Sequence, residues 1–497
     1  FIAPHFIEQL QPGERALRVD TTLDATLQTL VERQVRAYIL RNQNRGIHNA
    51  AVMLVDSRDM GVRSLVGSAD YFNRQIQGQV NGTTAKRSPG STLKPFIYAL
   101  GMEQGVLHPM TVLKDVPSTF GSYAPENFDR RFLGPVTATD ALNFGRNIPA
   151  VAIAAQLRQP SFYQFLRLAG ISNMASEKHY GLSLVLGGGE VTAQELAKLY
   201  AMLANRGELR PLRMRESDPV NTGVRLLSEE ASFMTLDILR QHRRPGETLG
   251  QRASSLPVYW KTGTSWGFRD AWSVGIFGPY VLVVWQGNFS GQGNNAFIGV
   301  EAAAPLFFNI IDSVAASYPQ LREPRHRFPP HLKKVDICLP SGNLPTQWCQ
   351  QRGSSWFIPG KSPITVDTVY RPLRIDNLSG KVACAPWDEH SSHVEVFEFW
   401  PSDLANVFAS AGLPKRPPPR GECQPESQSG SAPRITSPLK NTTYTLRQSQ
   451  RGRETISFSA VTDAASRTVY WFVDDLYLGS SPSQTPLDWQ PPGPPPY

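Results

Sequence analysis

The chain has 497 residues, enough for two or three domains and at least one large hydrophobic core. No apolar run reaches the roughly 18–20 residues that span a bilayer. The net charge of +8 comes from scattered Arg and Lys residues with few short clusters. This pattern favours a solvated basic surface, so we expect no nucleic-acid partner.

The first predicted elements are a helix and a hairpin. Between residues 20 and 50, apolar side chains such as Leu23 and Leu27 recur at helical spacing, and Thr22 is the expected N-cap. Residues 50–68 contain two strand-like runs around a polar turn, which predict a β-hairpin.

The middle of the chain changes from helices to strands. Residues 91–206 are mostly helical in pattern. Residues 257–287 hold three runs rich in Val, Trp, Tyr and Phe, separated by Gly-containing turns, which predict an antiparallel meander. A helix is expected at 303–317. This order of elements predicts an α+β domain with a central antiparallel sheet.

Proline-rich segments mark boundaries beyond this domain. Residues 319–334 lead into a segment that contains cysteines, and residues 413–433 form a low-complexity linker. Short strands between 443 and 479 have the spacing of a small β-sandwich. The final stretch 488–497, DWQPPGPPPY, is predicted not to form a strand because of its prolines.

The four cysteines, Cys338, Cys349, Cys384 and Cys423, lie in one segment. An even, clustered set favours one or two disulfides and an oxidising compartment. Sequence alone leaves the pairing open, and we expect Cys338–Cys349 and Cys384–Cys423. A zinc site is the alternative, but no C-x-x-C pair supports it.

Ser91 and Lys94 stand three residues apart at the start of a predicted helix, in KRSPGSTLKPF. Both side chains then lie on one face, beside free N–H groups that favour a developing anion. A lysine accepts a serine's proton only where burial or nearby cations lower its pKa. Ser91 as nucleophile and Lys94 as base is one interpretation; helix capping is the other, since S-x-x-K recurs at Ser437–Lys440.

Two other segments contain candidate site residues. In KTGTS, Gly263 indicates close approach to the backbone of an edge strand, with a bulge or turn as the alternative. Lys261 would bind a carboxylate of a peptide lying along this strand, and the N–H groups of Thr264 and Ser91 would together form an oxyanion hole. Asn147, at a corner between two helices, would point into the same cleft, or would be a simple turn residue.

Two further patterns are discounted. GTSWG, residues 263–267, matches a nucleophile elbow, but an elbow joins a strand to a helix and here a strand follows a strand. The histidine pair in 388–398 is predicted to lie in an exposed polar loop and not to bind a metal.

S-x-x-K, an S-x-N-like corner and K-T-G, in this order, resemble the signature of serine acyltransferases that react with penicillin. PGSTLKPFIYALGMEQG (89–105), LVLGGGEVTAQELAKLYAMLANRG (184–207) and WKTGTSWGFRDAW (260–272) are similar to the transpeptidase half of class A penicillin-binding proteins. The resemblance extends over nearly the whole chain.

The resemblance implies five parts. Residues 1–19 would be a linker from a missing N-terminal glycosyltransferase domain that also holds the membrane anchor. A transpeptidase domain (20–318), a Cys-containing module (319–412), the Pro-rich linker (413–433) and an Ig-like β-sandwich (434–497) would follow. The expected location is the periplasmic side of the bacterial inner membrane, and the C-terminal modules would bind wall polymer or a partner protein of wall synthesis.

The resemblance also implies catalytic roles. Ser91 would attack the D-Ala–D-Ala carbonyl of a peptidoglycan stem peptide, with Lys94 as base. Asn147 and Lys261 would orient the substrate and relay protons. An amine of a neighbouring stem would then take the acyl group, whereas a β-lactam would remain on Ser91. No cofactor or metal is expected.

The substrate-binding segment would be Thr262, Gly263 and Thr264. Both threonines would contact the substrate carboxylate, and the N–H groups of Ser91 and Thr264 would hold the oxyanion. Alternative functions are a D,D-carboxypeptidase, a serine β-lactamase or a non-catalytic scaffold that binds β-lactams.

Gly145 departs from the family pattern, which has a serine at this position. The missing hydroxyl removes a proton relay, and general acid–base help typically contributes about 10²–10⁴-fold to a rate. Acylation is therefore predicted to be slower than usual, with atypical β-lactam sensitivity.

Overall fold

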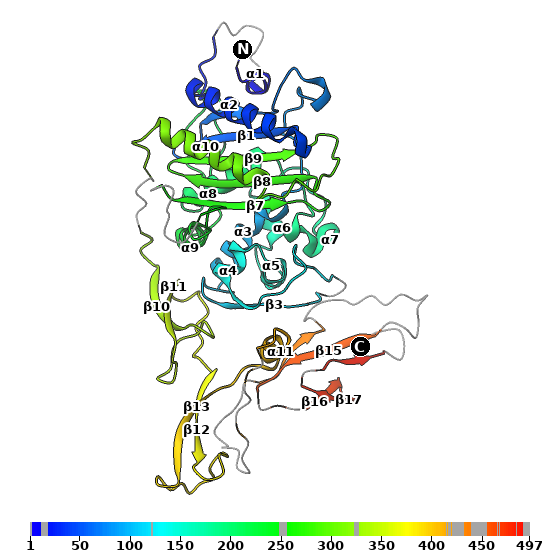
Figure 1. Cartoon of the computed structure of the whole chain (residues 1–497), viewed down its shortest axis with the longest axis vertical. Helices are drawn as coiled ribbons and strands as arrows, with labels where there is room; N and C mark the ends of the chain where they lie inside the picture. The colour runs from blue at the N-terminus through cyan, green and yellow to red at the C-terminus, as the bar shows by residue number, and fades with distance from the viewer. Residues whose placement is uncertain are drawn as a thin grey trace.

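The computed structural model describes most of the chain, and Figure 1 shows its arrangement. The described residues are 2–10, 18–120, 123–247, 256–322, 328–413, 415, 419, 432–438, 455–464, 466, 468–483 and 485–490. Among the helices formed by these residues, none is both long and apolar enough to cross a membrane.

The N-terminal half is built around a five-stranded antiparallel sheet with strand order β2-β1-β9-β8-β7. The pairing confirms the predicted hairpin and meander, and β7 lies at the edge. The strands are β1 (Ala50–Asp56), β2 (Val62–Val66), β7 (Val258–Thr264), β8 (Asp270–Phe277) and β9 (Tyr280–Gly287).

Both faces of this sheet are buried, because alternate residues of each strand point to opposite sides. On one face, Val52 and Leu54 pack with residues of α2 (Ala25–Asn42) and α10 (Ala303–Ser317). On the other face, Met53 packs with the helical insert. Beyond the β7 edge, Figure 1 shows three helices of the insert, α3 (Lys94–Glu103), α4 (Ala138–Asn143) and α5 (Asn147–Ala154). The cleft that the sequence predicts would lie between this edge and the insert.

The predicted run of helices is confirmed, and two pairs of short strands interrupt it. Its helices are α3 (Lys94–Glu103), α4 (Ala138–Asn143), α5 (Asn147–Ala154), α6 (Phe162–Leu168), α7 (Glu177–Tyr180), α8 (Ala193–Ala204) and α9 (Glu229–Arg240). One pair joins β3 (Val112–Asp115) with β4 (Gly134–Thr137). Two-residue strands β5 (Glu208–Leu209) and β6 (Val224–Arg225) lie between α8 and α9.

The N-cap of α2 is Asp24, so the prediction of Thr22 was wrong. The Asp24 side chain accepts hydrogen bonds from the N–H groups of Thr26 and Leu27. Thr22 is instead buried, and its hydroxyl donates to the carbonyl of Val62. The short acidic side chain nearer the helix therefore satisfies the free N–H groups.

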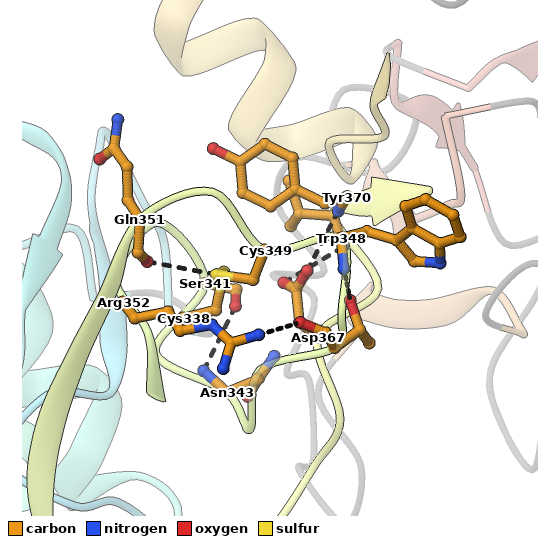
Figure 2. Close-up of a disulfide and its surroundings, with 11 residues drawn as sticks. Cys338, Ser341, Asn343, Trp348, Cys349, Gln351, Arg352, Asp367 and Tyr370 are labelled. Carbon is orange, nitrogen blue, oxygen red and sulfur yellow. Dashed lines mark hydrogen bonds between the residues drawn. A yellow bond between two sulfur atoms is a disulfide. The ribbon is translucent and has the colours of Figure 1, made fainter. Parts of the chain in front are cut away.

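The cysteine-containing segment forms two hairpins. They are β10 (Lys333–Cys338) with β11 (Arg352–Phe357), and β12 (Tyr370–Asp376) with β13 (Ser392–Glu398). The predicted Cys338–Cys349 disulfide is present (Figure 2). The predicted Cys384–Cys423 bond includes a residue outside the described part of the chain.

The prediction of an exposed loop over residues 388–398 was wrong, since 392–398 form β13. His393 is exposed and its ring lies 2.7 Å from Asn377 Oδ1. In the part of the chain that the structure describes, no group of three His, Cys, Asp or Glu side chains is placed to hold a metal.

The Cys module packs against the helical insert. Trp356 of β11 donates to Asp237 of α9 at 3.0 Å, and its ring meets that of Phe233 edge to face. The buried His108 ring lies 2.9 Å from Ser355 Oγ and packs on Phe357. These contacts connect two segments that are far apart in the sequence.

After α11 (Ser402–Ser410), the described C-terminal strands form two small sheets. One has order β14-β15-β18 and the other pairs β16 with β17. Asp488 and Trp489 belong to β18, so the prediction that no part of 488–497 is a strand was wrong. The prolines begin only at Pro491. The strands are β14 (Arg434–Ser437), β15 (Ile456–Val461), β16 (Thr468–Val473), β17 (Leu476–Pro482) and β18 (Leu487–Trp489).

Candidate active site

The turn before Ser91 packs directly against strand β7, with glycine on both sides of the contact. A Cβ added to Gly90 would lie 2.7 Å from the Thr264 nitrogen, and one added to Gly263 would lie 2.3 Å from the Pro89 carbonyl oxygen. Gly90 also has φ +53°, which L side chains rarely adopt. The close approach predicted for Gly263 is therefore an approach of the Ser91 turn itself.

Ser91 lies in a 3₁₀ turn, Gly90–Leu93, and α3 begins at Lys94. The sequence placed Ser91 in the first turn of the α-helix, and this was wrong by one turn. In a 3₁₀ turn, positions i and i+3 still lie on one side, so Ser91 and Lys94 keep the predicted relation. Pro95 stands within the first turn of α3, where its missing N–H costs nothing.

The turn is fixed by hydrogen bonds that the sequence did not reveal. Tyr200 of α8 donates to the Thr92 carbonyl at 2.7 Å. Trp272 of β8 donates its ring N–H to the Ser88 carbonyl at 2.8 Å. Because these donors come from two different elements, the backbone on both sides of Ser91 is held against the sheet.

Lys94 is fully buried beneath the turn. Its Nζ donates to the Gly145 carbonyl at 2.7 Å and to Asn147 Oδ1 at 2.5 Å, and not to Ser91 Oγ. Burial, helped by the neighbouring charges of Lys261 and Arg146, holds the pKa of Lys94 well below its ordinary value. The buried environment therefore favours the neutral amine.

Lys261 on β7 is the second buried lysine of the cleft. Burial lowers its pKa to about 8. A Cβ at Gly145 would lie 3.1 Å from Lys261 Nζ, so a side chain at this position would point at the Lys261 amine. The glycine that departs from the family pattern thus lies between the two lysines, since its carbonyl also accepts from Lys94.

Asp115 and Arg146 organise the corner that holds Asn147. The buried Asp115 accepts from Arg146 Nε at 2.7 Å and from Asn127 Nδ2 at 2.7 Å. The side-chain oxygen of Asn127 in turn accepts from the Asn147 N–H at 2.8 Å. The motifs did not predict this network, although the charged stretch 126–131, which contains Asn127, stands before the corner and could have indicated it.

The amide of Asn147 is held at both ends. Its Oδ1 accepts from Lys94, and its Nδ2 donates to the Glu126 carbonyl at 2.6 Å. This fixes which end of the amide faces the lysine. Asn147 therefore belongs to the cleft and is more than a turn residue.

Thr264 lies at the end of β7, where the turn meets the strand. Its Oγ1 accepts a hydrogen bond from the Gly299 N–H at 2.9 Å, which leaves its hydroxyl hydrogen free to donate. Thr262 lies two residues earlier and so on the same side of the strand. Both hydroxyls are half-buried on the edge strand of the sheet.

Three family models match the sequence. Residues 50–275 match the penicillin binding protein transpeptidase domain. Residues 328–372 match the C-terminal domain of penicillin-binding protein 1A, and residues 423–495 match the Penicillin-Binding Protein C-terminus Family.

Curated relatives match over a large part of the chain. It is 30% identical to penicillin-binding protein 1C of Escherichia coli (strain K12), across 95% of this chain and 62% of the relative. It is 27% identical to penicillin-binding protein 1F of Bacillus subtilis (strain 168), across 64% of this chain and 46% of the relative. The chain thus spans less than two thirds of the length of these relatives.

Solved structures share the fold. Penicillin-binding protein 1A from Haemophilus influenzae superposes with a TM-score of 0.54 at 21% identity, covering 64% of this chain and 54% of that chain. PonA1 from Mycobacterium tuberculosis gives a TM-score of 0.54 at 20% identity, covering 66% of this chain and 92% of that chain.

Proposed function

The chain is a class A penicillin-binding protein, as its motifs predicted, and from this premise we propose that it is a D,D-transpeptidase that acts through a Ser91 acyl-enzyme. Its substrates would be the D-Ala–D-Ala ends of peptidoglycan stem peptides. β-Lactams would acylate the same serine.

The observation that carries this proposal is the full burial of Lys94 together with its two hydrogen bonds, an environment that lowers its pKa and favours the neutral amine. A neutral amine has two N–H bonds and one lone pair, and the Gly145 and Asn147 oxygens accept the two N–H bonds. The lone pair is then the remaining group that can take a proton from Ser91. The bond between nucleophile and base is often long in an unliganded site and shortens when substrate binds.

The acylation step follows from the packing around the turn. Ser91 Oγ would bond to the substrate carbonyl carbon as its proton passes to Lys94. The N–H groups of Ser91 and Thr264 would receive the negative oxygen, and the Gly90–Thr264 contact keeps these two backbone segments adjacent. The proton would then move to the departing D-Ala nitrogen, with Asn147 holding the amine in place.

Lys261, Thr262 and Thr264 would bind the terminal carboxylate. The free hydroxyl hydrogen of Thr264 supports this role. A pKa of about 8 keeps Lys261 mostly cationic at neutral pH. A carboxylate beside it would stabilise that charge further.

PonA1, which shares this fold, has also been solved in complex with penicillin V. We extend this binding to Ser91 as part of the proposal. The proposed setting is the periplasmic side of the inner membrane, with residues 1–19 joined to an upstream glycosyltransferase and anchor. We also propose that residues 319–412, and residues 434–497 as an Ig-like sandwich, recognise wall polymer or a partner protein.

Mass spectrometry after incubation with a labelled penicillin tests the proposal. Wild type should gain one penicilloyl group on the peptide that contains Ser91, and Ser91→Ala should gain none. Ser88→Ala is a matched control, because Ser88 stands just before the Ser91 turn and its hydroxyl donates to the Gly187 carbonyl. Labelling of Ser91→Ala at the wild-type rate would overturn the assignment.

The group that accepts the acyl chain from Ser91 distinguishes a transpeptidase from the related enzymes. Incubation with a stem pentapeptide and an amine acceptor should give cross-linked product if the chain is a transpeptidase. Release of D-Ala without cross-links would instead show a D,D-carboxypeptidase. Loss of the penicilloyl group within seconds would show a β-lactamase, and labelling of Ser91 with no turnover would show a scaffold.

A further inference from the structure

A pocket of about 730 Å³ lies away from Ser91, at the C-terminal end of α2. Its walls come from α2 and the turn after it, from the loop that follows β2, and from residues 288–292 beyond β9. None of the site residues discussed above lines it. Its volume is in the range of roughly 300–1,000 Å³ that is usual for ligand pockets.

Asn and Gln dominate this pocket, and they divide into two groups. The Asn side chains build the walls: Asn49 Oδ1 accepts from two backbone N–H groups, Asn73 Oδ1 caps a 3₁₀ turn, and Asn288 Nδ2 donates to a carbonyl. The Gln side chains line the pocket and, within the described residues, form no hydrogen bond. They are Gln43, Gln75, Gln77 and Gln292.

The charge of the pocket is balanced. Arg36 and Asp70 are its one basic and one acidic residue, and His48 is exposed. A phosphate-rich or nucleic-acid ligand would need an excess of basic residues. The pocket therefore suits a ligand that is polar but neutral.

Apolar surface accompanies the amides. Leu40 is 70% exposed at the pocket, although it lies beside the buried Ile39. Phe289 also lines the pocket, and its ring stacks on Trp285 with centroids 5.2 Å apart. A sugar ring presents apolar C–H faces together with hydroxyls, and an acetamido group adds a methyl and an amide.

We propose that this pocket binds a saccharide of N-acetylated amino sugars. The free glutamine amides would donate to and accept from its hydroxyl and acetamido groups, and Leu40 and Phe289 would contact its ring faces. That this saccharide is the glycan strand of the substrate rests on the proposed function. The binding itself does not.

The pocket and the Ser91 cleft lie at the same end of the sheet. Gly287 at the end of β9 pairs with Asp270 at the start of β8, and Thr264 of β7 pairs with Ala271. Two strand spacings, about 10 Å, therefore separate the β9 and β7 ends. An extended peptide of four or five residues spans at most roughly 13–18 Å, so a stem peptide covers this lateral separation.

Arg87 connects the two places physically. Its guanidinium donates to the Phe289 carbonyl at 2.8 Å, and the chain continues from Arg87 to the Ser91 turn. The pocket opens on the α2 side of the sheet, whereas Lys261 faces the helical insert. The stem peptide of a glycan bound in the pocket would therefore pass the end of the sheet near Phe289 to reach Ser91.

Calorimetry with chitotetraose, a tetramer of β-1,4-linked N-acetylglucosamine, tests the proposal on the full chain. Ser290→Trp, which fills the pocket from its rim, should abolish measurable binding. Gln43→Ala and Gln292→Ala should each weaken it about 2–10-fold, the value of one hydrogen bond. Gln79→Ala is the matched control, because this exposed glutamine of the same loop does not line the pocket, and it should bind as wild type.

Three results would overturn the proposal. They are absence of chitotetraose binding to wild type, unchanged binding to Ser290→Trp, and equally tight binding of cellotetraose, which lacks acetamido groups. The two proposals fail separately: Ser91→Ala should keep saccharide binding, and Ser290→Trp should keep labelling by penicillin.

Discussion

The Ser91 cleft and the contact between the Cys module and the helical insert bury polar groups in opposite ways. The cleft gathers three basic side chains, Lys94, Lys261 and Arg146, around one buried acid, Asp115. In the module contact, the polar side chains instead form hydrogen bonds with neighbouring polar groups, and aromatic rings pack around these pairs.

The module contact contains no crowded charge. Lys361 pairs with Glu103 at 2.5 Å where both are partly exposed, and Trp356 donates to Asp237. Burial lowers the pKa of His108 to about 4, so this ring is neutral at pH 7. The cleft therefore keeps several basic groups buried, which costs folding free energy but lowers the pKa values of its lysines. The polar groups of the module contact contribute to stability only.

Replacing Lys94 tests this difference most strongly. Lys94→Met removes the proposed base, so the rate of acylation by a fluorescent penicillin should fall by about 10²–10⁴-fold. The free energy of unfolding, measured in urea, should stay level or rise because a desolvated amine is lost. At the module contact, Lys361→Met should leave acylation unchanged and cost about 1 kcal/mol or less. Wild-type acylation by Lys94→Met would refute the base assignment.

Asp115→Asn should be the most destabilising change in the cleft. It leaves the buried Arg146 without its main partner, which costs about 3–5 kcal/mol in free energy of unfolding. The loss of Asp115 should also lower the pKa of Lys94 further, because this carboxylate raises it. Asp129→Asn is the matched control, since Asp129 pairs with the same arginine but is 45% exposed. Equal costs for the two variants would show that burial is not decisive.

The disulfide should matter to the module and not to the cleft. Cys338 and Cys349 are 11 residues apart, and closing such a loop contributes about 2–4 kcal/mol. Replacing both with serine should speed hydrogen exchange in β10 and β11 while acylation stays at the wild-type rate. A parallel loss of acylation would mean that the module supports the cleft.

Acid should loosen the module contact through His108. The folded pKa of about 4 lies below the ordinary 6.5, so the open state binds more protons between these values. The stabilisation is complete above pH 6.5, falls as pH drops toward 4, and amounts to about 3 kcal/mol in total. Hydrogen exchange of 353–357 should therefore rise between pH 7 and pH 4.5. His108→Asn should reduce this pH dependence, and an unchanged profile would exclude His108 as its source.

Gly145→Ser should give the smallest effect. Its hydroxyl would stand beside Lys261 Nζ and restore a proton relay, so acylation should become several-fold faster. The φ of +67° at this position should cost about 1–2 kcal/mol for any side chain. Gly145→Ala supplies the same strain without the hydroxyl. If Gly145→Ser acylates no faster than Gly145→Ala, the missing relay does not limit the rate.

Local patterns in the sequence predicted the strands of the central sheet. Strand alternation and turn glycines are short-range signals, and they located β7, β8 and β9 correctly. The same alternation makes Lys261 face the helical insert, since its neighbour Trp260 packs on the face of the sheet that α2 and α10 cover.

Long-range polar contacts could not be predicted in this way. Asp115, Asn127 and Arg146 come from three separate segments, and no spacing rule relates them. The N-cap of α2 was predicted wrongly because Thr22 and Asp24 are both good caps by residue type, and only the tertiary structure, which buries Thr22, decides between them. The prediction missed strand β13 because only two of its seven residues are buried, so its sequence carries little of the regular alternation that marks a strand.

The glycine contact between the Ser91 turn and β7 limits how this cleft can evolve. At Gly90 and Gly263 the nearest neighbours include main-chain atoms, so even a methyl group would push the Ser91 turn, with its proposed nucleophile, away from Thr264, the proposed oxyanion donor. Drug pressure on the cell would therefore select few viable changes at these two positions. Altered susceptibility is expected to arise at exposed side chains nearby in the sequence, such as Trp266, which follows Thr264 by two residues and is 88% exposed.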